Sequence, residues 1–406
     1  MNQERGRAAP LRFCARRHAL LVDDLRPEAR AAPESGIVAV ANYGWSKPDV
    51  IPLWAGEGDL PTPAFIAEAA SRALAGGETF YTRQRGIPEL REALAAYHSR
   101  LFGRSFAPEE FFVTGGGMQA IQLAIDCVAG KGDELIYMSP AWPNFAGAVG
   151  VAGATPVPVR LTPGDNGWVC DVDRIAAAIT PRTRAIFLNT PSNPTGWTAD
   201  AETLRTVLDL ARRRGLWIIA DEIYSRFYYG GRRAPSFLDV MAEDDRIIFV
   251  NSFSKNWAMT GWRIGWIRAH PSLGQVIENL VQYSTSGVAQ FMQRGAVAAL
   301  TEGEAFVESQ IGRARQARDI VCSALAATGR ARVLPPQGAF YLFFAVDGVT
   351  DSLAACFDIV DKARVGLAPG MAFGEGADEW FRLCFHRRLD HVEAAATRLA
   401  EWIASR

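Results

Sequence analysis

A lysine that directly follows an apolar run is the first residue whose type and position could do chemistry. Lys255 ends the sequence Ser-Phe-Ser-Lys (252–255), and the next seven residues contain two tryptophans and a methionine. An amine held among apolar groups and cations loses its proton more easily, which frees it for Schiff-base chemistry. Arg263 follows eight residues later and could supply that cation or bind a phosphate. A solvated surface lysine is the alternative.

Polar side chains also follow two other apolar runs. Asp221 comes directly after Leu-Trp-Ile-Ile-Ala (216–220), where a buried carboxylate could pair with a protonated pyridine nitrogen. An ordinary helix N-cap is the alternative. Tyr224 falls on the same side if the turn after Asp221 is helical. Asn193 stands between two prolines, which would fix its side chain as a hydrogen-bond donor, whereas a plain turn is the alternative.

Three further segments could contact a ligand. The glycines that precede Met118 open a helical run, so their backbone N–H groups could hold a phosphate, although a tight turn is the alternative. Trp142 follows another strand and could stack on a flat ring or simply pack. Arg382 lies inside the apolar run Trp-Phe-Arg-Leu-Cys-Phe. A buried arginine needs an anion, which is either a substrate carboxylate or a structural salt-bridge partner.

The elements that position these residues form an α/β pattern. Helical periodicity with a proline in the first turn predicts helices over 64–75 and 87–101. Continuous apolar runs predict strands that are buried on both faces. These strands are expected at 134–138, 185–189, 216–220, 246–250 and 264–268. The spacing of the first four leaves room for crossover helices, so we expect a mostly parallel sheet.

The polar segments follow the ends of four of these strands. Ligands bind beyond the carboxyl ends of the strands in open α/β sheets, so these segments predict one shared site. After about residue 290 the pattern changes to a long helical stretch, with short strands near 339–346 and 380–385 and a final helix from about 390. That change predicts a smaller α+β domain.

Composition excludes several classes of function. The charged residues balance to 43 − 44 = −1, so no overall field attracts nucleic acid or an anionic membrane. Six scattered cysteines form no C-x-x-C pair, and no His/Cys pattern has metal-ligand spacing, so we expect no metal and a cytoplasmic location. Five arginines stand in residues 1–20 against one acid. We expect that stretch to be an arm rather than a transit peptide.

Taken in order, these segments resemble the class I/II aminotransferases, which are fold-type-I enzymes dependent on pyridoxal 5′-phosphate (PLP) and include aspartate and aromatic aminotransferases. The resemblance covers about residues 34–404. The matching segments are Ala55–Asp59 with Thr62-Pro63, Tyr81-Thr82 with Gly86–Arg91, Val113–Gly116, Asn189–Gly196, Asp221–Tyr224, Ser252–Lys255, Gly261–Gly265 and Arg382-Leu383.

The resemblance implies a role around the cofactor ring for each matching residue. Lys255 would form the Schiff base with PLP and then shuttle the proton between the substrate Cα and the cofactor C4′ atom. Asp221 would face the pyridine nitrogen, and Asn193 and Tyr224 would bond the ring hydroxyl. Trp142 would stack on the ring.

The resemblance also implies the residues that bind the phosphate and the substrate. The phosphate would be held by Ser252, Ser254, Arg263 and the backbone around Gly116, Gly117 and Met118. Arg382 would clamp the substrate α-carboxylate, with Asn193 and Gly56 lining the pocket. Tyr81 would reach the phosphate of the neighbouring subunit, so a homodimer with shared active sites is the expected assembly.

The fold implied by the resemblance is a large domain with a mostly parallel, seven-stranded sheet sandwiched by helices, plus a smaller α+β domain. We expect an N-terminal arm over residues 1–33 and a large PLP-binding domain over 61–290. Residues 34–60 would join 291–406 in the small domain.

The implied reaction moves an amino group from an L-amino acid to a 2-oxo acid, with 2-oxoglutarate or pyruvate as the expected acceptor. One aspartate-preferring branch carries a lysine where this chain has Met118, which favours an apolar or aromatic donor. A C–S β-lyase and a cyclopropane-forming synthase use the same fold and remain alternatives. A non-catalytic PLP-binding regulator is disfavoured, because about 35 residues are too few for a DNA-binding domain ahead of the fold.

Overall fold

The computed structural model describes residues 21–165 and 167–406, so the arginine-rich residues 1–20 of the predicted arm lie outside the described residues. A seven-stranded sheet forms the larger layer, in the order β2-β10-β9-β8-β7-β3-β4. Its strands are β2 (Phe111–Thr114), β3 (Glu134–Ser139), β4 (Thr155–Arg160), β7 (Thr183–Asn189), β8 (Trp217–Asp221), β9 (Ile247–Ser252) and β10 (Gly265–Arg268). All neighbours from β4 to β9 pair in parallel, and only β10 is antiparallel to its neighbours in this sheet. The predicted mostly parallel sheet is confirmed.

The strands of this sheet are apolar at successive positions because both of its faces are covered. Ile218 of β8 packs into the core on one face, and its neighbour Ile219 packs into the core on the other. Both side chains are fully buried. A strand that exposed one face to water would instead alternate apolar and polar residues.

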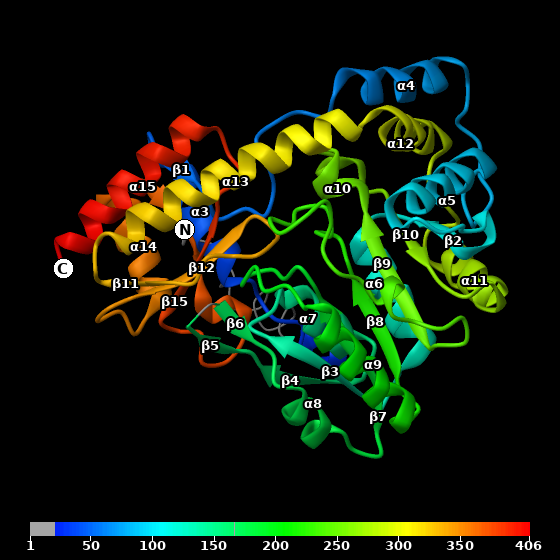
Figure 1. Cartoon of the computed structure of the whole chain (residues 1–406), viewed down its shortest axis with the longest axis horizontal. Helices are drawn as coiled ribbons and strands as arrows, with labels where there is room; N and C mark the ends of the chain where they lie inside the picture. The colour runs from blue at the N-terminus through cyan, green and yellow to red at the C-terminus, as the bar shows by residue number, and fades with distance from the viewer. Residues whose placement is uncertain (1–20, 166) are drawn as a thin grey trace, which may run out of the picture.

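Helices cover both faces of the larger sheet (Figure 1). The helices that accompany this sheet are α4 (Ala64–Ala75), α5 (Pro88–Phe102), α6 (Gly117–Val128), α7 (Pro143–Val151), α8 (Val172–Ala178), α9 (Ala201–Arg214), α10 (Phe253–Asn256), α11 (Gly274–Ser284) and α12 (Gln290–Glu302), and of these α4 packs on α12 at the periphery. The predicted helices at 64–75 and 87–101 are α4 and α5. Helix α5 starts at Pro88 and is followed by the capping residue Gly103, whose φ of 68° is left-handed, as helix termini favour.

A smaller sheet has the order β11-β12-β15-β14 and lies beside the larger one (Figure 1). Its strands are β11 (Ala331–Val333), β12 (Tyr341–Val346), β14 (Ala368–Pro369) and β15 (Trp380–Cys384). Short two-stranded pairs join β1 (Ile51–Pro52) to β13 (Val365–Gly366), and β5 (Thr162–Gly164) to β6 (Gly167–Val169). The strands predicted near 339–346 and 380–385 are confirmed as β12 and β15.

Helices α3 (Gly36–Trp45), α13 (Glu304–Ala326), α14 (Ser352–Lys362) and α15 (Leu389–Ala404) accompany the smaller sheet. Helix α13 runs from beside α12 towards α15 (yellow in Figure 1). Helix α12 packs against α4 and α5, so the helices around the larger sheet continue to about residue 302. The domain limits stay predictions. None of the helices among residues 21–165 and 167–406 has the length and hydrophobicity to cross a membrane.

Candidate active site

The carboxyl ends of the central strands bring the predicted site residues together. Asn189 at the end of β7 is level with Asp221 of β8, and Asp221 is level with Val250 of β9. A cavity of about 430 Å³ opens at this edge. Of the predicted residues, all but Gly116 and Tyr81 line it. They are Gly56, Gly117, Met118, Trp142, Asn193, Asp221, Tyr224, Ser252, Ser254, Lys255, Arg263 and Arg382.

Lys255 lies in the short helix α10, directly after β9. Its side chain is partly open to the cavity, and its amine donates a 2.6 Å hydrogen bond to the carbonyl of Gly56. The surrounding protein removes the ammonium from bulk water, and this desolvation lowers the pKa of Lys255 to about 8. At a pKa of about 8, roughly a tenth of the amine is unprotonated at pH 7, and that is the form that a nucleophile or base requires.

Asp221 is buried at the end of β8, with 4% of its surface exposed. Its carboxylate accepts a hydrogen bond from the Ile223 backbone N–H (3.2 Å) and forms no ion pair with a described residue. Desolvation raises the pKa of Asp221 to about 7. The chain continues as a turn rather than a helix, so Asp221 caps no helix. Its side chain is a buried acid without an ion pair among the described residues, and the charge of Lys255 only partly offsets its desolvation.

Arg382 crosses from the smaller sheet into the cavity. Its Nη1 donates to the side-chain oxygen of Asn193 (3.0 Å), and its Nη2 donates to the Trp54 carbonyl. Its Nε is buried and has no hydrogen-bond partner among residues 21–165 and 167–406. The guanidinium is thus held by neutral oxygens alone and retains donors for an anion, which is the arrangement that a substrate carboxylate needs.

The start of α6 lies at the rim of the same cavity. Gly116 precedes this helix with a φ of 89°, and no side chain in the described part of the chain caps the first turn. The φ of 89° favours glycine, and a Cβ atom on Gly116 would lie 2.6 Å from Nη2 of Arg263, so a side chain there would push this guanidinium from its position. The uncapped N–H groups, Arg263 and the nearby Ser252 hydroxyl form a setting that suits a phosphate.

Comparison with known proteins decides the family. The profile of the family described as aminotransferase class I and II matches residues 48–399. An aspartate aminotransferase of Pyrococcus horikoshii is 35% identical over 86% of this chain and 90% of that protein. An aspartate/prephenate aminotransferase of Thermus thermophilus is 34% identical over 93% and 97%. A solved alanine aminotransferase of Pyrococcus furiosus superposes with a TM-score of 0.88 at 27% identity, covering 94% and 100%.

The chain belongs to the class I and II aminotransferase family. It is a PLP-dependent enzyme that moves an amino group from an amino acid to a 2-oxo acid, and the expected fold type is confirmed. These relatives favour amino-group transfer over the lyase, synthase and regulator alternatives.

The cavity of this aminotransferase fits PLP on three counts. Lys255 offers an amine of lowered pKa, and Asp221 is a buried acid that lacks the cation a protonated pyridine ring would supply. The glycine-rich start of α6 leaves uncapped N–H groups beside Arg263 for a phosphate.

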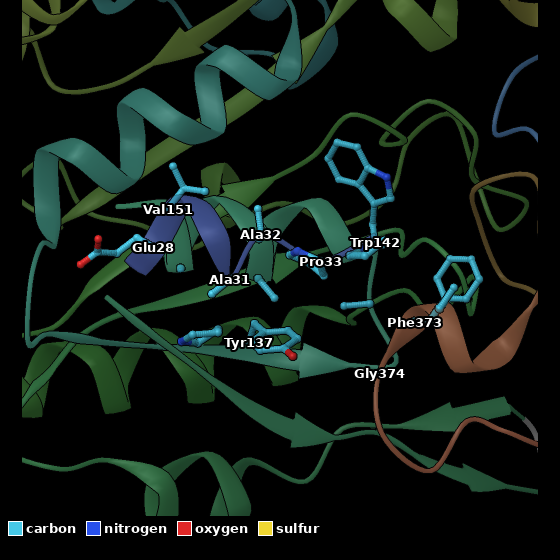
Figure 2. A pocket seen from close by; sticks show the side chains of 16 residues that line it. Glu28, Ala31, Ala32, Pro33, Tyr137, Trp142, Val151, Phe373 and Gly374 are labelled. Carbon is cyan, nitrogen blue, oxygen red and sulfur yellow. The ribbon is translucent and has the colours of Figure 1, made fainter. Parts of the chain in front are cut away.

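Trp142 separates this cavity from a second, largely apolar one of about 340 Å³. Figure 2 shows Trp142 and Phe373 at one end of the second cavity, Glu28 at the other, and Tyr137 along its floor. Trp142 is half-buried and precedes α7. Its indole is therefore a wall of the aminotransferase cavity.

Tyr81 is the predicted residue that lies apart from the cavity of its own chain. It is 94% exposed, in a segment between α4 and α5. Arg85 in the same segment pairs with Glu278. The aminotransferase thus presents an aromatic side chain on its surface.

Sequence reasoning missed several residues that line the cavity. Tyr341 of β12 lies 2.7 Å from Tyr224, hydroxyl to hydroxyl. Its strand was visible as an apolar run, but nothing local marks a tyrosine within it as a site residue. Ile37 of α3 also lines the cavity. Asn189 accepts from the Asn193 N–H (2.8 Å), and its position at a strand end was a usable signal.

Proposed function

We propose that this aminotransferase takes the amino group from an apolar or aromatic L-amino acid and passes it to 2-oxoglutarate or pyruvate, with Lys255 as its catalytic base. The observation that carries the proposal is a single cavity in which a lysine of lowered pKa, a buried unpaired acid and a buried arginine converge. PLP, when bound, supplies an aldehyde for the substrate nitrogen and a ring that accepts electrons from the substrate Cα.

We propose that Lys255 removes the proton from the substrate Cα. Its amine donates to the Gly56 carbonyl, a contact that would hold the nitrogen inside the cavity once the substrate has replaced it on the cofactor. Arg382 binds the α-carboxylate through the donors that Asn193 and Trp54 leave free, which orients the Cα–H bond. Gly56 lines the pocket beside them.

The remaining side chains hold the cofactor in this proposal. Asp221 keeps the ring nitrogen protonated, because a buried carboxylate gains most from a cation beside it. Asn193 and Tyr224 bind the ring hydroxyl, and Trp142 stacks on the ring. The phosphate is held by Ser252, Ser254, Arg263 and the backbone of Gly116, Gly117 and Met118.

The positively charged side chains of the cavity leave none for a second substrate carboxylate, which supports an apolar or aromatic amino donor. Among the described residues that line it, the positive side chains are Lys255, Arg263 and Arg382, and each has a role already. Met118 and Ile37 present apolar surface instead. A second carboxylate buried there, on the donor or on 2-oxoglutarate, would lack a partner, which is costly. Of the two proposed acceptors, this argument therefore favours pyruvate. The relatives named for aspartate do not transfer that donor to this chain.

We propose a homodimer in which Tyr81 completes the partner's site. Three exposed aromatic side chains support it, with exposed fractions of 81% for Phe80, 94% for Tyr81 and 87% for Tyr283. The segment that carries Tyr81 is tied to the end of α11 by a hydrogen bond from Gln84 to Gln282 (2.6 Å). Large aromatic groups exposed in one region are typical of a contact surface.

We propose a cytoplasmic location. The described cysteines are free, and burial raises the pKa of Cys127 to about 11 and that of Cys322 to about 12. Thiols kept in this state fit a reducing compartment.

The test of the function combines a covalent trap with a panel of donors. PLP-loaded enzyme is reduced with borohydride and mapped by mass spectrometry, and a PLP adduct on Lys255 is expected. Single-turnover absorbance then compares L-phenylalanine, L-leucine and L-aspartate as donors, and the first two are expected to react faster. An adduct elsewhere would refute the role of Lys255, and a preference for aspartate would refute the donor class.

Two variants sharpen this test. Lys255→Ala is expected to slow the half-reaction by about 10²- to 10⁴-fold, the range for loss of a positioned base. Met118→Lys adds a cation to the apolar wall and is expected to move the preference towards L-aspartate.

A further inference from the structure

A pair of buried hydroxyl groups joins the two sheets inside the cavity. Tyr224 follows β8 of the larger sheet, and Tyr341 begins β12 of the smaller one. Their oxygens lie 2.7 Å apart, and 4% of Tyr224 and none of Tyr341 is exposed. Both side chains line the cavity. No other hydrogen bond of either hydroxyl is present within the described part of the chain.

Glycine at position 56 makes room for this pair. A Cβ atom there would lie 2.5 Å from the Tyr341 hydroxyl oxygen, closer than two such atoms can approach. Tyr341 also lies under the guanidinium of Arg382, 4.8 Å from the ring centre. The Tyr341 ring is therefore held by Arg382, and its hydroxyl lies between Gly56 and Tyr224.

We propose that Tyr341 is a positioning residue, which donates its hydroxyl proton to Tyr224 and thereby directs the Tyr224 hydroxyl at the ring oxygen of the cofactor. The inference rests on the proposed role of Tyr224. A tyrosine hydroxyl has one proton to donate. If Tyr224 gives its proton to the cofactor, the bond between the two tyrosines is donated by Tyr341.

When Tyr341 donates to Tyr224, the hydrogen bond that Tyr224 donates to the ring oxygen of the cofactor becomes stronger. A hydroxyl that accepts a hydrogen bond becomes a better donor, by about 10–30% per bond. Burial raises the pKa of both tyrosines, so both stay protonated over the working pH range. The ionisable groups near the pair on neighbouring elements include Asp221, Arg382, Cys384 and Glu57, together with Lys255, whose amine lies 6.0 Å from the centre of the Tyr224 ring.

The test is a spectroscopic pH titration of the PLP-loaded enzyme. Its visible band changes when the Lys255 nitrogen, next to the negative ring oxygen, loses its proton. Donation from Tyr224 stabilises that oxygen and weakens its hold on the proton, so removal of the donor raises the titration midpoint. Tyr224→Phe is expected to raise it most, and Tyr341→Phe by about 0.2–0.6 pH unit. The double variant is expected to match Tyr224→Phe alone, because Tyr341 acts through Tyr224.

Tyr229→Phe is the matched control. The Tyr229 hydroxyl is also shielded from water and donates to the Ala339 carbonyl (2.7 Å), away from the cavity. The titration midpoint of Tyr229→Phe is therefore expected to equal that of the wild type. An unchanged midpoint in Tyr341→Phe, or shifts that add in the double variant, would overturn the inference. An unchanged midpoint in Tyr224→Phe would instead overturn the role of Tyr224 on which it rests. Thermal unfolding of each variant verifies that the fold is intact.

Discussion

The protein shields two ionisable groups of the cavity, Asp221 and Lys255, from water, and this shifts their pKa values in opposite directions. Burial raises the pKa of Asp221 to about 7 and lowers that of Lys255 to about 8. Each shift disfavours the charged form of the group. For the Asp221 carboxylate, the protonated ring nitrogen of a bound cofactor would offset this cost. At the residue scale, the desolvation of these two groups therefore costs folding free energy in the cofactor-free protein, which we call the electrostatic stress of the cavity.

The stress on Asp221 predicts a pH-dependent stability of the cofactor-free protein. Between about pH 4 and pH 7 the folded chain keeps the Asp221 proton and the unfolded chain does not, so stability falls as the pH rises through this window. Asp221→Asn removes the titration. We expect the variant to be more stable than the wild type at pH 8 by about 2–4 kcal/mol and nearly equal at pH 4.

Urea unfolding of the cofactor-free proteins at both pH values measures this difference. Asp244→Asn is the control, because Asp244 is exposed on a loop, and no such dependence is expected there. Equal stabilities of Asp221→Asn and wild type at pH 8 would show that the buried carboxyl carries no such stress. Glu222, whose pKa burial also raises to about 7, is present in both proteins and cancels.

At the element scale, the start of α6 depends on one left-handed glycine. Gly116→Ala would place a methyl group against the Arg263 guanidinium at a φ of 89°, at a cost of about 1–3 kcal/mol for the backbone alone. We expect the variant to bind PLP at least about tenfold more weakly, since the N–H groups and Arg263 can no longer converge. Absorbance titration with PLP gives the affinity.

Gly103→Ala is the control that separates the effect of backbone strain from the loss of the proposed phosphate-binding site. Gly103 also has a left-handed φ of 68°, but a Cβ there meets no atom within 4 Å. It is expected to lower stability and leave PLP affinity unchanged. If Gly116→Ala bound PLP as tightly as Gly103→Ala, the start of α6 would not be the phosphate site.

The elements themselves could be predicted wherever the local pattern reflects burial. The predicted helix at 64–75 matches α4 at both ends, since Pro63 precedes it and Gly76 follows it. The strand ends also revealed Asp221 and Lys255, because polar residues break an apolar run there. Tyr341 could not be found this way. Its partner Tyr224 is 117 residues away, and a contact over that distance exists only once the two sheets have packed together.

At the scale of the whole molecule, the site draws on both sheets, and we propose that it also draws on the partner subunit. Mixed dimers test this. Tyr81→Ala and Lys255→Ala are each expected to be impaired, but a dimer of one chain of each has one site with both residues intact. We expect such dimers, isolated with two affinity tags, to regain about half of the wild-type activity.

A dimer of wild-type and Lys255→Ala chains is the reference, since it also contains one intact site. Equal activity of the two mixed dimers is the expected outcome. If the Tyr81→Ala/Lys255→Ala dimer were no more active than its parents, Tyr81 would act in its own chain, or not at all.

The bonds that Arg382 makes to Asn193 and the Trp54 carbonyl have a consequence for selectivity. These oxygens are neutral, so they hold the guanidinium in place without balancing its charge. A neutral amide or alcohol could bond the remaining donors but would leave that charge uncompensated. An anion would compensate it, so we expect the enzyme to discriminate against uncharged analogues of its substrates without any steric barrier.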